Sequence, residues 1–176
     1  TGKAFHVAAK FNENGGGTIP HGDSISYKEK DVKLENTEKG KYMTFKNLGE
    51  YYGIALKYVV EIVGIQRITA IPEVEDYIKG LINLRGKIIP VIDVRTRFKM
   101  EPVEYNDRTC IIVVRLQEMV IGLIVEQIAE VVEILPEDIL DPPVLGKEEK
   151  SVENRYVYGI GQVGDSVKLL IDPEKL

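Results

Sequence analysis

Few residues in this sequence have the types and spacing that catalysis or metal binding requires. The histidines, His6 and His21, are not brought together with Asp23 by any helical or turn spacing, so we expect no metal site. The single cysteine, Cys110, lies in an apolar run that favours a buried, unreactive thiol. No nucleophile is spaced for activation by a base. We therefore expect no catalytic residue and no cofactor.

A glycine run at residues 15–17 is the only stretch that could suggest a phosphate-binding loop. No Gly-Lys-Ser/Thr follows it and no apolar strand precedes it, so its resemblance to such a loop is superficial. Residues 1–40 are polar and lack a sustained hydrophobic period, which predicts a flexible extension.

Arg85 is the charged residue whose setting is most informative. Ile82 and Leu84 alternate with polar residues, as in a half-buried strand, and Gly86 supplies the positive φ of a tight reversal. The following run, 87–92, returns as a second strand, and its Pro90 indicates an edge or a bulge there. This hairpin would hold the guanidinium in a fixed place. It could serve a partner or pair with a local carboxylate, and both interpretations stay open.

The composition excludes several classes of protein. With 176 residues, of which 44% are hydrophobic, the chain can bury one ordinary core or two small ones. No apolar run approaches the ~20 residues of a membrane helix, so we expect no membrane insertion. A net charge of −5 argues against a nucleic-acid module, and a lone cysteine fits a reducing cytoplasm.

The charges are unevenly distributed along the chain. Residues 79–99 contain six basic side chains and one acid, whereas residues 118–153 contain ten acids and two lysines. Such asymmetry can steer a charged protein partner, although it is also what two solvated faces would show.

Apolar periodicity predicts a chain made mostly of short strands. Hairpins are expected at residues 41–56, 82–92, 109–125 and 156–171. Three segments are predicted differently: Val59, Ile62 and Val63 have helical spacing within residues 57–63, residues 65–71 form a strand, and residues 73–79 form a helical turn.

The chain also resembles itself. Residues 53–63 align without gaps on residues 122–132, and residues 80–93 match residues 159–172 with one residue inserted, which places Gly86 opposite Gly164. A repeat of roughly 70 residues is too long for a solenoid and suits two small tandem barrels of about five strands each. We therefore predict barrels at residues 41–105 and 106–176.

The repeat singles out one pair of residues. Glu61 and Glu130 occupy equivalent places, but only the first copy carries Asn83, Leu84 and Arg85. Function specific to one barrel should therefore lie near Arg85. A Glu61–Arg85 pair is a hypothesis that follows. An exposed pair would contribute only ~0–1 kcal/mol to stability, so its main effect would be to fix the position of the Arg85 guanidinium.

Six segments together resemble the CheW family of chemotaxis coupling proteins, over residues 42–176. They are Tyr52-Gly-Ile, Val59-Val-Glu-Ile62, Tyr77-Ile-Lys-Gly80, Asn83-Leu-Arg-Gly86, Pro90-Val-Ile-Asp93 and Leu169-Leu-Ile-Asp172. The resemblance implies a mainly β fold of two tandem SH3-like five-stranded β-barrels with pseudo-twofold symmetry and short helical turns. This agrees with the internal repeat.

The resemblance also implies a function without catalysis. Members of the family are cytoplasmic adaptors that link the cytoplasmic tip of methyl-accepting chemoreceptors to the regulatory domain of the histidine kinase CheA. Outside the receptor array we expect a monomer. The alternative is a CheW-like regulatory domain of a chemotaxis kinase or of a CheV-type coupling protein.

Carried over to this sequence, the family's receptor-binding groove comprises six residues: Val59, Glu61, Ile62, Gly80, Arg85 and Gly122. Val59 and Ile62 would receive the apolar stripe of a helical receptor tip while Arg85 fixes its orientation. Core packing is the other interpretation of Val59 and Ile62, and a turn or a close backbone approach is the other interpretation of the two glycines.

Overall fold

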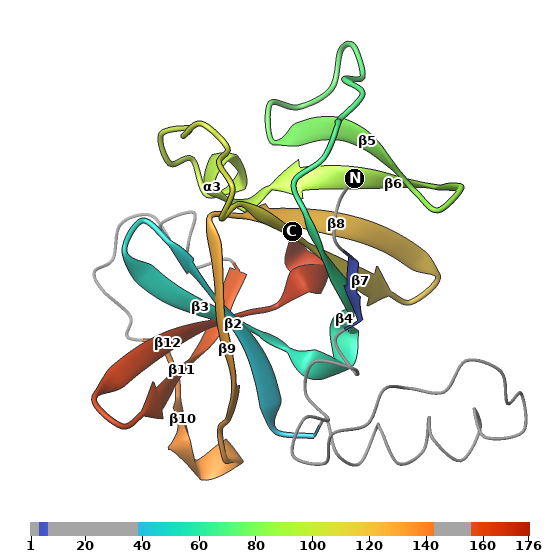
Figure 1. Ribbon diagram of the computed structural model, residues 1–176. Helices are drawn as coiled ribbons and strands as arrows, with labels where there is room; N and C mark the ends of the chain where they lie inside the picture. The colour runs from blue at the N-terminus through green and yellow to red at the C-terminus, as the bar shows by residue number, and fades with distance from the viewer. Residues whose placement is uncertain (1–3, 7–38, 143–155) are drawn as a thin grey trace, which may run out of the picture.

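Two six-stranded sheets make up the described part of the chain. The computed structural model describes residues 4–6, 39–142 and 156–176. The first sheet has the strand order β1-β4-β7-β8-β6-β5 and the second β10-β11-β12-β3-β2-β9 (Figure 1). The predicted mainly β class is confirmed.

The first sheet consists of β1 (Ala4–His6), β4 (Val59–Gly64), β5 (Ile78–Leu84), β6 (Lys87–Asp93), β7 (Cys110–Leu116) and β8 (Met119–Val125). The second consists of β2 (Lys41–Asn47), β3 (Glu50–Ala55), β9 (Gln127–Glu133), β10 (Ile139–Leu140), β11 (Val157–Val163) and β12 (Ser166–Ile171). The described ranges contain four short helical turns: η2 (Leu56–Tyr58), α3 (Val94–Arg97) and η3 (Pro136–Asp138) between strands, and η4 (Pro173–Lys175) after β12. No helix in the described ranges is long and apolar enough to cross a membrane.

The sheets do not follow the predicted division at residue 105. The hairpin β2–β3 comes from the first sequence repeat but joins the second sheet, between β12 and β9. Conversely, the hairpin β7–β8 comes from the second repeat and lies between β4 and β6 in the first sheet. Each repeat thus gives its first hairpin to the other sheet. Sequence similarity between the repeats identifies equivalent residues. It does not tell whether a strand pairs with strands of its own repeat or with strands of the other.

The strand registers place residues that are equivalent in the repeat at equivalent positions in the two sheets. β6 runs parallel to β8 with Val91 opposite Gly122, and β12 runs parallel to β3 with Leu170 opposite Gly53. Two-residue turns follow Leu84 in the first copy and Val163 in the second. The inserted residue of the sequence alignment is therefore unnecessary, and the structural counterpart of Gly164 is Arg85 rather than Gly86.

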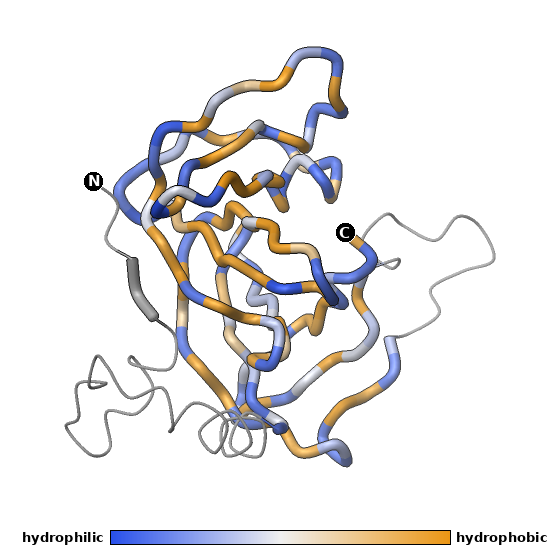
Figure 2. Tube along the Cα trace, turned by 90° about the vertical axis from the view of Figure 1, so that its right-hand side faces the viewer, coloured by the Kyte–Doolittle hydropathy of each residue, from blue (hydrophilic) through white to orange (hydrophobic). Residues whose placement is uncertain are grey.

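A core cluster shared by both sheets holds them together. It includes Phe45 and Tyr52 from the second sheet, Ile62 and Ile112 from the first, and Phe98 after α3. The rings of Phe45, Tyr52, Phe98 and Tyr156 form a chain with successive centroid distances of 5.7, 5.6 and 5.3 Å. Apolar stretches accordingly run through the strands, with hydrophilic stretches at the turns (Figure 2).

The predicted helix at residues 57–63 is wrong beyond its first residues. Only η2 is helical there, and Val59 already begins β4. A bulge lies between Val59 and Glu61, which pair with the consecutive residues Val114 and Val113. The extra residue brings Val59 and Ile62 to the same face at a spacing of three, which imitates a helical pattern. β-branched side chains such as these also favour a strand.

Several smaller predictions differ from the structure, and others stay untested. Residues 65–71 contain one isolated bridge, Thr69 to Leu81, instead of a strand. The helical turn predicted at residues 73–79 is absent from this described stretch, which has turns at 72–73 and 76–77 and then begins β5 at Ile78. β6 is an inner strand, although its pairing with β8 starts only at Val91, just after Pro90. Cys110 is half-buried. Within the predicted extension, Ala4–His6 pair with β4, and residues 7–38 lie outside the described residues.

Candidate functional site

The hairpin β5–β6 presents Arg85 as predicted. Arg85 and Gly86 form its two-residue turn with φ of 52° and 85°, the left-handed values of a type I′ turn. Asn83 stabilises the turn because its Oδ1 accepts a hydrogen bond from the backbone N–H of Gly86 at 2.8 Å. Arginine in this conformation is strained by roughly 1–2 kcal/mol relative to glycine. The residue is thus held at an exposed corner at some cost in stability.

Arg85 forms the ion pair that the repeat suggested. Its Nη2 donates to Oε1 of Glu61 on β4. The two partners differ sharply in environment, because the Arg85 side chain is 54% exposed and the Glu61 side chain only 3%. The hydrogen bond to Glu61 raises the pKa of Arg85 above its ordinary value despite partial desolvation. The guanidinium therefore stays charged and anchored to a buried carboxylate.

The burial of Glu61 changes the energetic interpretation of the pair. The sequence predicted an exposed pair of little energetic value, but Glu61 lies opposite Val113, a member of the apolar cluster inside the first sheet. Desolvating a carboxylate is costly unless donors compensate it, so Arg85 supports the fold as well as facing solvent.

Val59 and Ile62 are core residues. Both are buried in the cluster shared by the two sheets, on the face that packs against Val114 and Ile112. The core-packing interpretation is therefore the one that the structure favours. The residue between them in β4 that does reach solvent is Val60.

Gly80 and Gly122 occupy places of close approach. A Cβ at Gly80 would lie 2.0 Å from the carbonyl oxygen of Thr69, and its φ of 141° disfavours other residues. A Cβ at Gly122 would lie 2.7 Å from Ile111 Cγ2 and 2.8 Å from Val91 Cγ1. Both glycines are buried and let neighbouring segments approach each other. Of the six predicted residues, Arg85 alone is strongly exposed.

Two exposed apolar residues near Arg85 were missed in the sequence. Ile88 in β6 is 61% exposed, and Met119 at the start of the neighbouring strand β8 is 57% exposed. Ile88 pairs with the exposed Asn83, so the hairpin register places it on the outer face. That register was readable from the alternation of residues 82–84. Met119 carried no such signal.

The predicted absence of a metal site involved residues that are mostly not described. His21 and Asp23 lie outside the described ranges. Among the residues that the structure does describe, no three His, Cys, Asp or Glu side chains are arranged to hold a metal ion.

We expect Arg85→Ala to lower the free energy of unfolding by about 1–2 kcal/mol, because Glu61 loses its guanidinium donor while staying buried. Glu61→Gln removes the buried charge and should cost less. In the Glu61→Gln background, Arg85→Ala should cost clearly less than in wild type. Urea denaturation of the four proteins checks this coupling, and an equal cost in both backgrounds would contradict it.

Gly80→Ala should destabilise the protein by about 2–4 kcal/mol, since the new Cβ meets rigid backbone at a positive φ. Gly64→Ala is the matched control, because a Cβ there meets nothing within 4 Å. Thermal unfolding of both variants tests the structural role of Gly80. Similar stability of the two variants would show that the approach to Thr69 is not tight.

Comparisons with known proteins agree on one family. A family model described as the CheW-like domain matches residues 41–176. The chemotaxis protein CheW of Klebsiella aerogenes is 34% identical over 145 residues, covering 82% of this chain and 86% of the relative. The chemotaxis protein CheW of Treponema pallidum is 29% identical over 160 residues, with coverages of 89% and 92%.

A solved structure supports the same relationship. The crystal structure of the scaffolding protein TtCheW from Thermoanaerobacter tengcongensis matches with a TM-score of 0.68 at 35% identity. The match covers 76% of this chain and 88% of that one. Sequence family and fold therefore agree over nearly all of the described chain. The chain belongs to the CheW-like domain family.

Proposed function

We propose that this chain is a chemotaxis adaptor that couples methyl-accepting chemoreceptors to the histidine kinase CheA by scaffolding, without a catalytic step of its own. Its relatives are chemotaxis proteins, and one of similar fold is described as a scaffolding protein. The observation that carries the proposal is the anchored, exposed guanidinium of Arg85 at the corner of a stiff hairpin.

The proposed receptor-facing surface is centred on Arg85. Glu61 orients the guanidinium, and the exposed side chains of Ile88 and Met119 offer apolar contact beside it. A helical receptor tip with an apolar stripe and an acidic residue would complement this combination. Val59, Ile62, Gly80 and Gly122 support the surface from below through core packing and close backbone approach.

The kinase contact belongs to a different surface in this proposal, since one protein cannot bridge two partners through one patch. Each interface would be modest in affinity, and their combination in an array would raise the local concentration of receptor and kinase. The proposal places the protein in the cytoplasm as a monomer outside such an array.

The test is a titration of isotope-labelled protein with a receptor-tip fragment and, separately, with the regulatory domain of CheA. We expect the receptor fragment to shift backbone amides around Arg85, Ile88 and Met119, and the kinase domain to shift another set. Arg85→Ala should weaken receptor binding about tenfold or more, as expected for the loss of a charge-assisted contact.

Arg108→Ala is the matched control, because Arg108 is an exposed arginine just before β7, at the end of that strand opposite to Met119. It should bind the receptor fragment like wild type. If both variants weakened receptor binding equally, Arg85 would act only through the net charge of the protein. No response of the folded wild-type protein to either partner would contradict the coupling function.

A further inference from the structure

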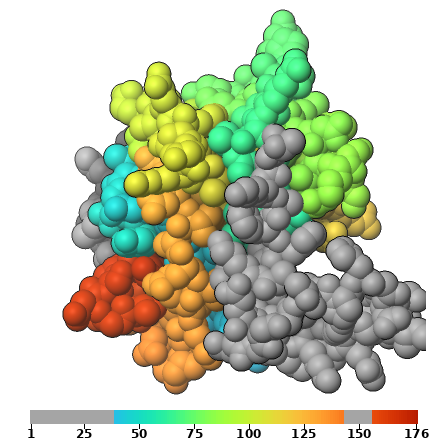
Figure 3. Space-filling model, viewed as in Figure 1, coloured from blue at the N-terminus to red at the C-terminus, as the bar shows by residue number. Residues whose placement is uncertain are grey.

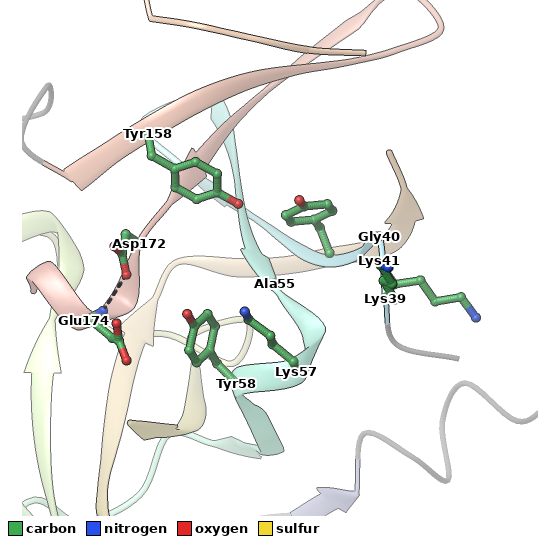
Figure 4. Close-up of a pocket in the computed structure, with 10 residues that line it drawn as sticks. Lys39, Gly40, Lys41, Ala55, Lys57, Tyr58, Tyr158, Asp172 and Glu174 are labelled. Atoms are coloured by element: carbon green, nitrogen blue, oxygen red, sulfur yellow. Dashed lines mark hydrogen bonds between the residues drawn. The ribbon is translucent and has the colours of Figure 1, made fainter. Parts of the chain in front are cut away.

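The second sheet carries an open cleft at one end. Its volume is about 870 Å³, and it lies between the start of β2, η2, β11 and the residues after β12. The lining residues on which the argument depends are Gly40, Ala55, Lys57, Tyr158, Asp172 and Glu174. Figure 4 shows Tyr158 and Tyr58 on opposite sides of this space, with Asp172 beside them.

The internal repeat relates this cleft to a place in the first sheet that is nearly closed. There the remaining cavity measures only about 10 Å³. Asp93 in that cavity corresponds to Asp172, Ile124 to Ala55 and Glu126 to Lys57, with Arg95 and Thr109 matching Glu174 and Gly40 in the same way. The two sites are thus equivalent positions of the fold, and only the first is filled by residues that the structure describes.

The filled site is occupied by the chain's own link between α3 and β7. Val103 and Tyr105 of this link line the cavity, and the Tyr105 hydroxyl donates to Asp93 Oδ2 at 2.6 Å. Burial and the Asp93 carboxylate both raise the pKa of Tyr105, so its hydroxyl remains a donor. The link appears in yellow in Figure 3, packed on the outside of the molecule next to the orange surface of the residues around 125.

Asp172 has the same local geometry as Asp93 but lacks the tyrosine. Its Oδ1 accepts from the backbone N–H of Glu174 at 3.0 Å, just as Asp93 Oδ1 accepts from that of Arg95 at 2.9 Å. Within the described ranges, no hydroxyl donates to Asp172 Oδ2. The counterpart of the acceptor that holds Tyr105 therefore lines a cleft that none of the described residues fills.

The charges around the cleft point to the same kind of occupant. The segment that fills the first site, residues 101–107, is acidic and contains Glu101, Glu104 and Asp107 around its tyrosine. The described lining of the cleft includes three lysines, Lys39, Lys41 and Lys57, and two carboxylates, Asp172 and Glu174, so its net charge is +1. Lys57 extends over the ring of Tyr58, with its Nζ 5.0 Å from the centroid (Figure 4). The excess of positive charge in this lining favours an acidic ligand.

We propose that this cleft is a docking site for an acidic, tyrosine-bearing segment of a partner protein. The tyrosine hydroxyl donates to Asp172 Oδ2, and flanking carboxylates of the segment face the lysines. A second copy of this chain is a poorer occupant, because it would first have to withdraw its own Tyr105 from Asp93. The site is separate from the Glu61–Arg85 surface and does not depend on the proposed receptor contact.

The probe is a capped peptide with the sequence of residues 101–107, Glu-Pro-Val-Glu-Tyr-Asn-Asp, added to the isotope-labelled full chain. We expect saturable shifts of the amides of Gly40, Ala55 and Lys57, with a dissociation constant on the order of millimolar, the concentration scale of tethered contacts. Replacing the peptide's tyrosine by phenylalanine should weaken binding roughly fivefold to tenfold, as should Asp172→Asn.

Lys57→Ala should also weaken binding, and more so at low salt. Lys87→Ala is the control, because Lys87 is an exposed lysine on the first sheet. Equal binding of the tyrosine and phenylalanine peptides would overturn the proposal. Amide shifts centred on Asp93 or Arg85 would also overturn it, and so would the absence of any shift up to several millimolar peptide. Shifts at the cleft on concentrating the protein alone would assign it to a second copy and overturn the choice of partner.

Discussion

The exchange of hairpins between the two repeats is the constraint on which the rest of the structure depends. The parallel pairs β6–β8 and β12–β3 join strands that lie in different repeats, so neither sheet can be completed without the other half of the chain. Gly122 and Gly53 sit at equivalent points in these pairs, where the strands pack closely. Packing across the shared core then sets the orientation of both sheets, and with it the position of every exposed group.

The Glu61–Arg85 pair shows how this scaffold makes one repeat different from the other. Glu61 has a counterpart in Glu130, but the position of Arg85 is taken by Gly164 in the second copy. The exposed guanidinium of Arg85 therefore has no counterpart at the equivalent position of the second copy. Tyr105 likewise closes the site at Asp93, whereas none of the described residues closes the equivalent cleft at Asp172. Differences between equivalent sites are where a duplicated fold acquires distinct partners.

Much of this fold was predictable from local pattern, and the failures have physical reasons. Alternation of polar and apolar residues predicted the hairpin at Arg85, and comparison of the two repeats suggested Glu61 as its partner. β4 was mistaken for a helix because a bulge places Val59 and Ile62 on one face. The hairpin exchange was invisible, since sequence similarity carries no information on pairing between copies. The outward face of Ile88 was readable from its position opposite Asn83, whereas the exposure of Met119 was not.

The central claim is that this chain transmits receptor state to a kinase by holding both partners. The most direct measurement is the rate of CheA autophosphorylation in a mixture of receptor-containing vesicles, kinase and increasing amounts of this chain. The account predicts that kinase activity rises with the wild-type chain and far less with Arg85→Ala at equal folded concentration. Kinase activity that is independent of the chain, with receptor and kinase both functional, would contradict it.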